Sequence, residues 1–134
     1  MVSKLDNAFA FQQQALGLRA HRQQILASNI ANADTPNYKA RDFDFSTALK
    51  DAVAGRRSGN LPLATTSLRH LTGSLDDGPA HLMYRTPSQA SADGNTVDMD
   101  VERAQFSENA IQYEAGMRFI TGKIKTMLTA IQGQ

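Results

Sequence analysis

Between Phe106 and Ile131, apolar residues are spaced alternately four and three positions apart without interruption. The members of this row are Phe106, Ala110, Tyr113, Met117, Ile120, Ile124, Met127 and Ile131. Such a heptad seam predicts a long helix that packs along a partner helix with a left-handed superhelical twist. Asp98 can cap this helix, and Asp100 and Glu102 suit the positive end of its dipole.

The partner is predicted at the other end of the chain. Residues from about Ser3 to Asn32 are good helix formers without proline, and would make a helix of about 45 Å. Two apolar seams run along this segment: Leu5, Phe9, Leu16, Ala20, Ala27 and Ile30 on one, and Ala8, Phe11, Ala15, Leu18 and Ile25 on the other. The fold class is therefore mainly α, with long N- and C-terminal helices packed as an antiparallel coiled-coil-like hairpin.

The two helices carry more apolar surface than one hairpin can bury, because Ile111 and Phe119 lie off the heptad seam. Gly17, Gly116 and Gly122 weaken the isolated helices but permit close approach of neighbours. We expect helix packing to use Leu5, Phe9, Leu16, Ile30, Phe106, Tyr113, Met117, Ile120, Ile124 and Met127. Contacts between subunits are expected at Phe11, Leu18, Ile25, Ile111 and Phe119. The alternative is that these extra apolar residues cover the middle of the same chain.

The middle of the chain holds all four prolines and most of the glycines, so it is predicted to be irregular with short extended pieces. We expect a short helix at 46–53 ended by Gly55, and extended pieces at 61–66 and 81–86. Arg56 and Arg57 are expected to be solvated in a loop. The domain organisation follows as 1–33 for the N-terminal helix, 34–96 for the turn and middle segment, and 97–134 for the C-terminal helix, with both termini forming one assembly domain.

Composition and motifs exclude several functions. A net charge of +1 gives no basic face for nucleic acid, and the absence of cysteine excludes thiolate metal sites. His21, His70 and His81 form no metal pair on one helix face, and "DGNTVDMDVE" does not fit the calcium-loop template, so this stretch is expected to cap and turn. The sequence contains no phosphate loop or nucleophile elbow. We expect no enzyme activity, no cofactor and no metal.

No run of about 20 apolar residues is present, so we expect no membrane span. The first residues, "MVSKLDNAFAFQQQ", also lack the uninterrupted apolar region of a signal peptide. If the chain leaves the cytoplasm, we expect a route other than the ordinary secretory signal.

The stretch "NIANADTPNY" predicts a helix stop followed by a turn. Asn29 and Asn32 can hydrogen-bond groups at the helix end, and Pro36 prevents continuation. Asn37 tolerates positive φ at the second corner of a turn, after which Tyr38 can fold back onto the helix.

"NIANADTPNY" is similar to the N-terminal signature of the bacterial flagellar basal-body rod and hook proteins. "YKARDFDF" and "DGNTVDMDVERAQFSENAIQYEAGMRF" resemble the proximal rod proteins of the FlgB type in particular. The match covers both terminal helices and their adjoining turns. Asn37 departs from the glycine usual in the family, although both residues accept the same backbone conformation.

The resemblance implies a structural subunit that polymerises through its terminal helices, transmits torque and lines the export channel. It also implies export through the flagellar type III apparatus without a cleaved signal peptide, and a place in the periplasmic rod of the basal body. The implied partners are copies of itself, other proximal rod proteins and the adaptor joining the rod to the membrane ring. The alternative function is another helical adaptor or chaperone of a type III export system.

Overall fold

The computed structural model describes residues 4–55, 78–87 and 91–133, and the side chains of these residues from Phe9 onward. It contains the long helices α1 (Lys4–Ala31) and α3 (Met99–Gln132) and a short helix α2 (Phe45–Val53). Two short strands, β1 (Arg41–Asp42) and β2 (Met83–Tyr84), complete the described elements. The fold is therefore mainly α, as the sequence predicts.

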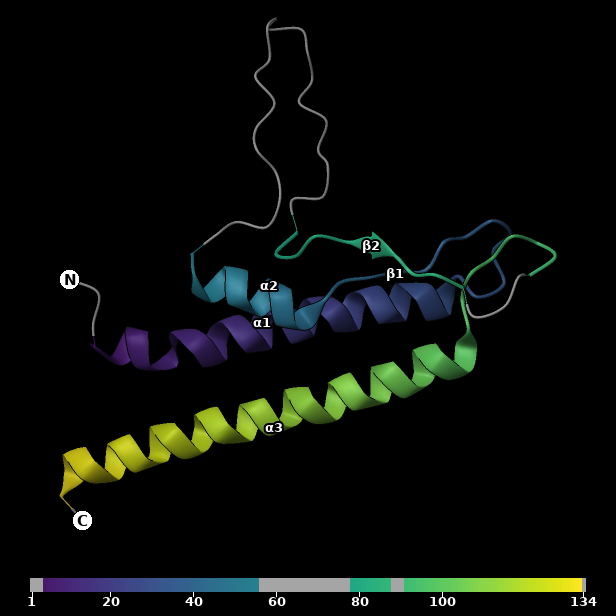
Figure 1. Ribbon diagram of the computed structural model, residues 1–134. Coiled ribbons are helices and arrows are strands. Elements are labelled where there is room, and N and C mark those ends of the chain that lie inside the picture. The colour runs from purple at the N-terminus through teal and green to yellow at the C-terminus, as the bar shows by residue number, and fades with distance from the viewer. Residues whose placement is uncertain (1–3, 56–77, 88–90, 134) are drawn as a thin grey trace, which may run out of the picture.

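The two long helices lie side by side, and the start of α1 and the end of α3 are at the same end of the molecule (Figure 1). α1 is the central element, since it contacts α3, α2 and β1. Within the described residues, no helix is sufficiently long and apolar to cross a membrane.

Helix boundaries follow from local capping. Asp98 begins α3, and its carboxylate accepts hydrogen bonds from the backbone N–H groups of Asp100 and Val101 at 3.1 and 3.3 Å. Asp44 caps α2 in the same way through the N–H of Ser46 at 2.9 Å. The predicted short helix is confirmed and begins one residue earlier than expected, at Phe45.

Strands β1 and β2 form an antiparallel pair in which Arg41 faces Tyr84 and Asp42 faces Met83. Strand β2 falls within the extended piece expected at 81–86. The expected extended piece at 61–66, the loop with Arg56 and Arg57, and His70 lie outside the described residues.

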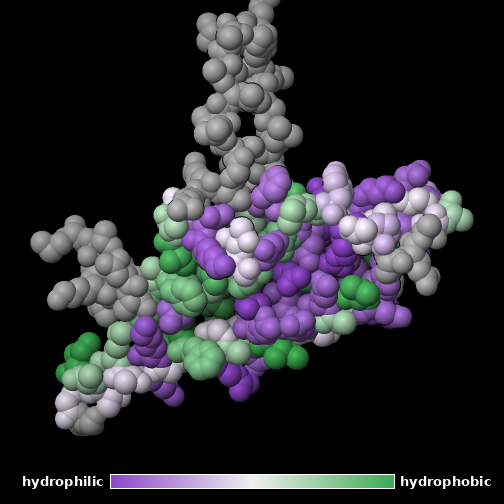
Figure 2. Space-filling view, in the orientation of Figure 1, coloured by the Kyte–Doolittle hydropathy of each residue, from purple (hydrophilic) through white to green (hydrophobic). Residues whose placement is uncertain are grey.

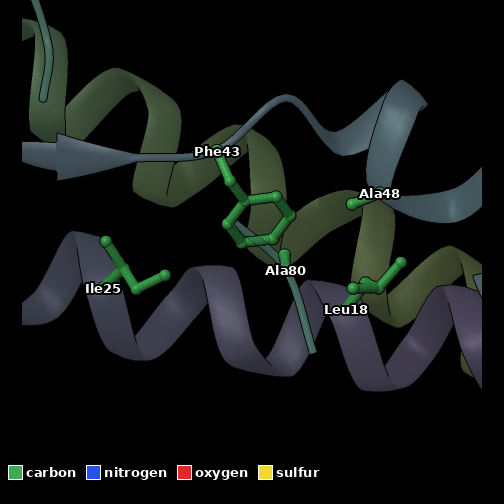
Figure 3. Close-up of a cluster of buried hydrophobic side chains, with 5 residues drawn as sticks. All are labelled: Leu18, Ile25, Phe43, Ala48 and Ala80. Atoms are coloured by element: carbon green, nitrogen blue, oxygen red, sulfur yellow. The ribbon is translucent and has the colours of Figure 1, made fainter. Parts of the chain in front are cut away.

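The hydrophobic core lies on the side of α1 that α2 and the β1 segment cover, and it is small (Figure 3). Leu18 and Ile25 of α1 pack with Phe43, with Ala48 of α2 and with Ala80. His21 is half-buried, and its ring stacks on Phe43 with centroids 5.8 Å apart.

The prediction that Leu18 and Ile25 face neighbouring subunits is wrong. They are only 2% and 9% exposed, because the β1–α2 segment folds back over this face of α1. For Leu18 and Ile25 the alternative holds, since they cover the middle of the same chain, whereas Phe11 of the same seam is exposed.

Candidate assembly interface

The contacts between α1 and α3 recur every six or seven residues and run in opposite directions along the two helices. Lys123 places its ammonium 5.5 Å from the ring centroid of Phe9. One heptad further along α1, the side chain of Leu16 lies against the backbone of Gly116. The next heptad joins Gln23 to Asn109, whose side-chain amides hydrogen-bond at 2.6 Å. The last contact joins Asn29, six residues further along α1, to Glu102. One continuous row of α3 therefore faces α1.

This row differs from one of the two that we predicted. The α3 column that contacts α1 was not predicted, and it consists of Glu102, Asn109, Gly116 and Lys123. In the neighbouring predicted column, Phe106, Ile120 and Met127 are half-buried and Tyr113 is exposed. Met117 and Ile124, predicted to pack against α1, are 46% and 44% exposed. The predicted second column is thus not the buried one.

A physical reason for this rotation is polar pairing. Asn109 is buried and donates to the backbone carbonyl of Arg19 at 2.9 Å as well as to Gln23. Glu102 is also buried, and it accepts a hydrogen bond from the amide of Asn29 at 3.2 Å. Because buried polar groups are costly unless paired, these bonds fix the face that α3 presents. The spacing of apolar residues alone does not reveal which face of α3 packs on α1.

Most of the remaining residues predicted to pack between the helices are half-buried. Phe9, Leu16, Ile30, Phe106, Ile120 and Met127 are half-buried, and Tyr113 is slightly more exposed. The side chain of Leu5 lies outside the described set.

An ion-pair network joins both long helices to the strands. Asp42 of β1 accepts hydrogen bonds from the guanidinium groups of Arg22 at 2.8 Å and of Arg85 at 2.7 Å. Arg85 also pairs with Glu102 of α3 at 2.5 Å, and both arginines donate to the amide oxygen of Gln105. Because these five residues come from α1, β1, α3 and the residue after β2, the network holds the middle segment against both helices.

The pKa values of the two carboxylates in this network are shifted in opposite directions. Burial raises the pKa of Asp42, but the hydrogen bonds from Arg22, the Phe43 N–H and Arg85 outweigh it, so the pKa lies below its ordinary value. For Glu102, burial dominates and raises the pKa, although Asn29 and Arg85 act against it. The hydrogen bond that Arg22 donates to Asp42 raises the pKa of Arg22, and burial opposes this shift.

The turn after α1 has the conformation that the sequence predicts. Asn37 has φ of 61°, in the left-handed region. The hydroxyl of Tyr38 folds back to within 3.3 Å of both the Ser28 hydroxyl and the Asn29 side-chain oxygen. Asn32 donates to the carbonyl of Ser28 at 2.8 Å, at the helix end as expected. Pro36 is exposed beyond the end of α1.

Asn29 has a different role from the one expected. Rather than satisfying the helix end, its amide donates to the carbonyl of Arg41 at 2.8 Å and accepts from the N–H of Arg41 at 3.1 Å. It is fully buried, so it fixes the position of β1 on α1.

The segment before α3 packs directly on this turn. The amide of Asn95 lies within hydrogen-bonding distance of the carbonyls of Asn32, Ala33 and Thr35, at 3.0, 2.7 and 2.9 Å. Asn37 N–H donates to the carbonyl of Asp93 at 2.9 Å. The stretches "NADTPNY" and "DGNTVD" are therefore one structural unit, although about 60 residues separate them.

Apolar side chains remain exposed on both long helices. Phe11, Ile111 and Phe119, three of the five residues expected between subunits, are exposed, with Phe119 at 74%. Hydrophobic residues gather toward the end of the molecule where α3 ends, and hydrophilic residues dominate the opposite half (Figure 2). In the described part of the chain, no group of three or more His, Cys, Asp or Glu could hold a metal ion.

The sequence resembles proteins of known role over its whole length. A family model described as "Flagella basal body rod protein" matches residues 9–39, which include the turn after α1. Flagellar basal body rod protein FlgB of Salmonella typhimurium is 50% identical over 99% of this chain and 99% of its own length. The proteins of the same name from Proteus mirabilis and Escherichia coli are each 49% identical over 98% of both chains. The chain belongs to the FlgB family.

This FlgB-family chain is accordingly a structural component of the flagellar basal body rod and not an enzyme. Membership decides between the two functions that the sequence left open, in favour of the rod component over another export adaptor or chaperone. It places the chain in the basal body rod and among the other proteins of that rod.

Sequence patterns missed the polar residues that fix the fold, namely Glu102, Asn109, Asn95, Asp42, Arg22 and Arg85. Glu102 had been assigned to the helix dipole alone. One feature could have revealed two of them: Glu102, Asn109, Gly116 and Lys123 are spaced by seven, alongside an apolar column with the same spacing.

Proposed function

We propose that this chain is a subunit of the proximal rod and polymerises through its terminal helices. In this proposal α1 and α3 form an antiparallel coiled-coil-like hairpin, and residues 1–33 and 97–134 make one assembly domain around the segment 34–96. The observation that carries the proposal is the heptad-spaced contact row between α1 and α3, together with the apolar column at Met117 and Ile124 that this row leaves exposed. Such a surface suits a subunit that is completed by neighbours.

The mechanical role follows from the geometry of long helices. A rod that transmits torque needs many contacts along its subunits and no single hinge. At about 1.5 Å per residue, the 34 residues of α3 extend about 50 Å, so each subunit offers a long contact line. Parallel alignment of such hairpins around an axis would also line a central export channel.

The proposed partners are copies of this chain, other proximal rod proteins and the adaptor that joins the rod to the membrane ring. The proposed route is type III export without a cleaved signal peptide, to a periplasmic position in the rod. Phe11, Ile111 and Phe119 are the residues that we propose for contacts with neighbours, and their exposure supports this.

The test is deletion of the gene followed by imaging of isolated basal bodies. The proposal expects ring complexes without a rod, no hooks and no motility. Complementation with the wild-type chain should restore all three and place the chain in purified basal bodies. Intact hooks in the deletion strain would refute the proposal.

A further inference from the structure

An apolar groove of about 410 Å³ runs between α1 and α3. Phe11, Ala15 and Leu16 line it from α1, and Gly116 and Phe119 line it from α3. The two charged residues that line it, Arg19 and Lys123, are both basic. The lining of the groove is thus largely apolar and includes two basic side chains, of which Arg19 lies over the Phe45 ring and Lys123 near the Phe9 ring.

A second apolar surface lies on the opposite side of α3. Met117 is two residues from Phe119, which places the two side chains about 200° apart around the helix axis. We call this surface the α3 ridge; its positions, spaced by four and three, are Ala110, Glu114, Met117, Thr121, Ile124, Leu128 and Ile131. All of them are exposed, and Ile131 reaches 79%.

We propose that the α3 ridge of a second copy of this chain docks in the groove between α1 and α3. An apolar helix face with a 4-3 spacing is the shape that such a groove accepts. Glu114 is the only charged residue of the ridge, and its charge is opposite to that of the two basic residues lining the groove, Arg19 and Lys123. Its present partner, Arg118, is one turn away and strongly exposed, so exchanging it costs little.

Because groove and ridge face opposite ways on one helix, this contact is heterologous. Each copy that fills a groove presents its own groove to the next copy, so association continues instead of closing into a two-fold dimer. The inference rests on the proposed function and adds to it which surfaces of this chain meet.

Disulfide crosslinking tests the pairing, since the chain has no native cysteine. The double variant Gln112→Cys with Thr121→Cys places one thiol at the groove and one on the ridge, both at exposed polar positions. Nine residues of helix separate them by about 13 Å on different sides, which prevents a bond within one copy. The two single variants, and Gln112→Cys with Lys50→Cys on α2, are the controls.

The variants are expressed in a flagellated strain that lacks its own copy of the gene, and basal bodies are oxidised and analysed without reductant. We expect crosslinked dimers and larger oligomers of this chain in the double variant. These species should be absent from both single variants and from the α2 control. Dimers in a single variant, or crosslinks only to another protein, or no crosslink, would overturn it.

These outcomes are distinct from failure of the proposed function. If the wild-type chain is absent from basal bodies, the rod assignment itself fails. If the wild-type chain restores motility but the double variant gives no ladder, only the groove and ridge pairing fails.

Discussion

Leu16 lies so close to Gly116 that a Cβ added to the glycine would be 2.9 Å from the Cδ2 atom of Leu16. A larger residue at position 116 would therefore have to displace the end of the Leu16 side chain. By contrast, an added Cβ at Gly122 meets nothing within 4 Å in the chain. The two glycines of one helix thus have different reasons to be there.

Gly116→Ala and Gly122→Ala separate helix propensity from packing. Gly122→Ala should stabilise the monomer by about 1 kcal/mol, because alanine favours the helix and the space is open. Gly116→Ala should give a clearly smaller gain or a loss, since Leu16 must move. Urea denaturation followed by circular dichroism measures both. Equal gains would contradict the close approach.

Gly94 and Gly55 form a second matched pair. Both have positive φ, at 72° and 68°, but only Gly94 would place a Cβ against a neighbour, 2.7 Å from the side-chain oxygen of Asn37. Gly55→Ala should cost about 1 kcal/mol from backbone strain alone. Gly94→Ala should cost distinctly more, because the added Cβ would also press against the Asn37 side chain of the turn. Similar unfolding midpoints for the two variants would show that the turn at Asn37 does not pack closely against Gly94.

Asp42→Asn should remove an acid-sensitive part of the stability. The folded pKa of Asp42 lies below its ordinary value of 3.8, so its contribution is present above about pH 4 and is lost as the pH falls through the folded pKa. The variant should be destabilised by about 2 kcal/mol at neutral pH, since Arg22 and Arg85 lose a partner. The difference should shrink below pH 4, whereas Asp34→Asn, at an exposed position, should show little effect.

Glu102→Gln should show the opposite pH dependence. Burial raises the folded pKa of Glu102 above 4.5, so its contribution is present below that pH and is lost as the pH rises through the folded pKa. The stability of the wild type relative to the variant should therefore fall as the pH rises from about 4 toward neutral. Denaturation curves at a series of pH values measure it. If the stability of the wild type relative to the variant increased over this pH range, the direction assigned to the Glu102 pKa shift would be wrong.

The sequence was sufficient for features that depend on local chemistry. The cap at Asp98, the positive φ of Asn37 and the short helix before Gly55 each follow from one residue type at one place. The two long helices follow from period and composition. The face that each helix presents did not follow, because it depends on residues far apart in the chain.

Two positions illustrate this limit. Leu18 was expected at a subunit contact, but the segment carrying Phe43 folds over it, and period alone does not indicate which element covers a seam. Asn109 lies outside the apolar heptad seam, yet its pairing with Gln23 of α1 determines which side of α3 is buried. A buried amide does not appear in the spacing of apolar residues, so only the folded structure reveals it.

We expect neighbouring subunits in the rod to cover the apolar face of α3 that is exposed in one chain. Ile124→Asp tests it most directly, because Ile124 is 44% exposed, whereas Ile120→Asp would also disturb the half-buried side facing α1. The measurement is the amount of the Ile124→Asp chain in purified basal bodies, alongside the unfolding midpoint of the purified protein. The account predicts an unchanged midpoint and loss of the chain from the rod; a variant present at wild-type level, with normal motility, would contradict it.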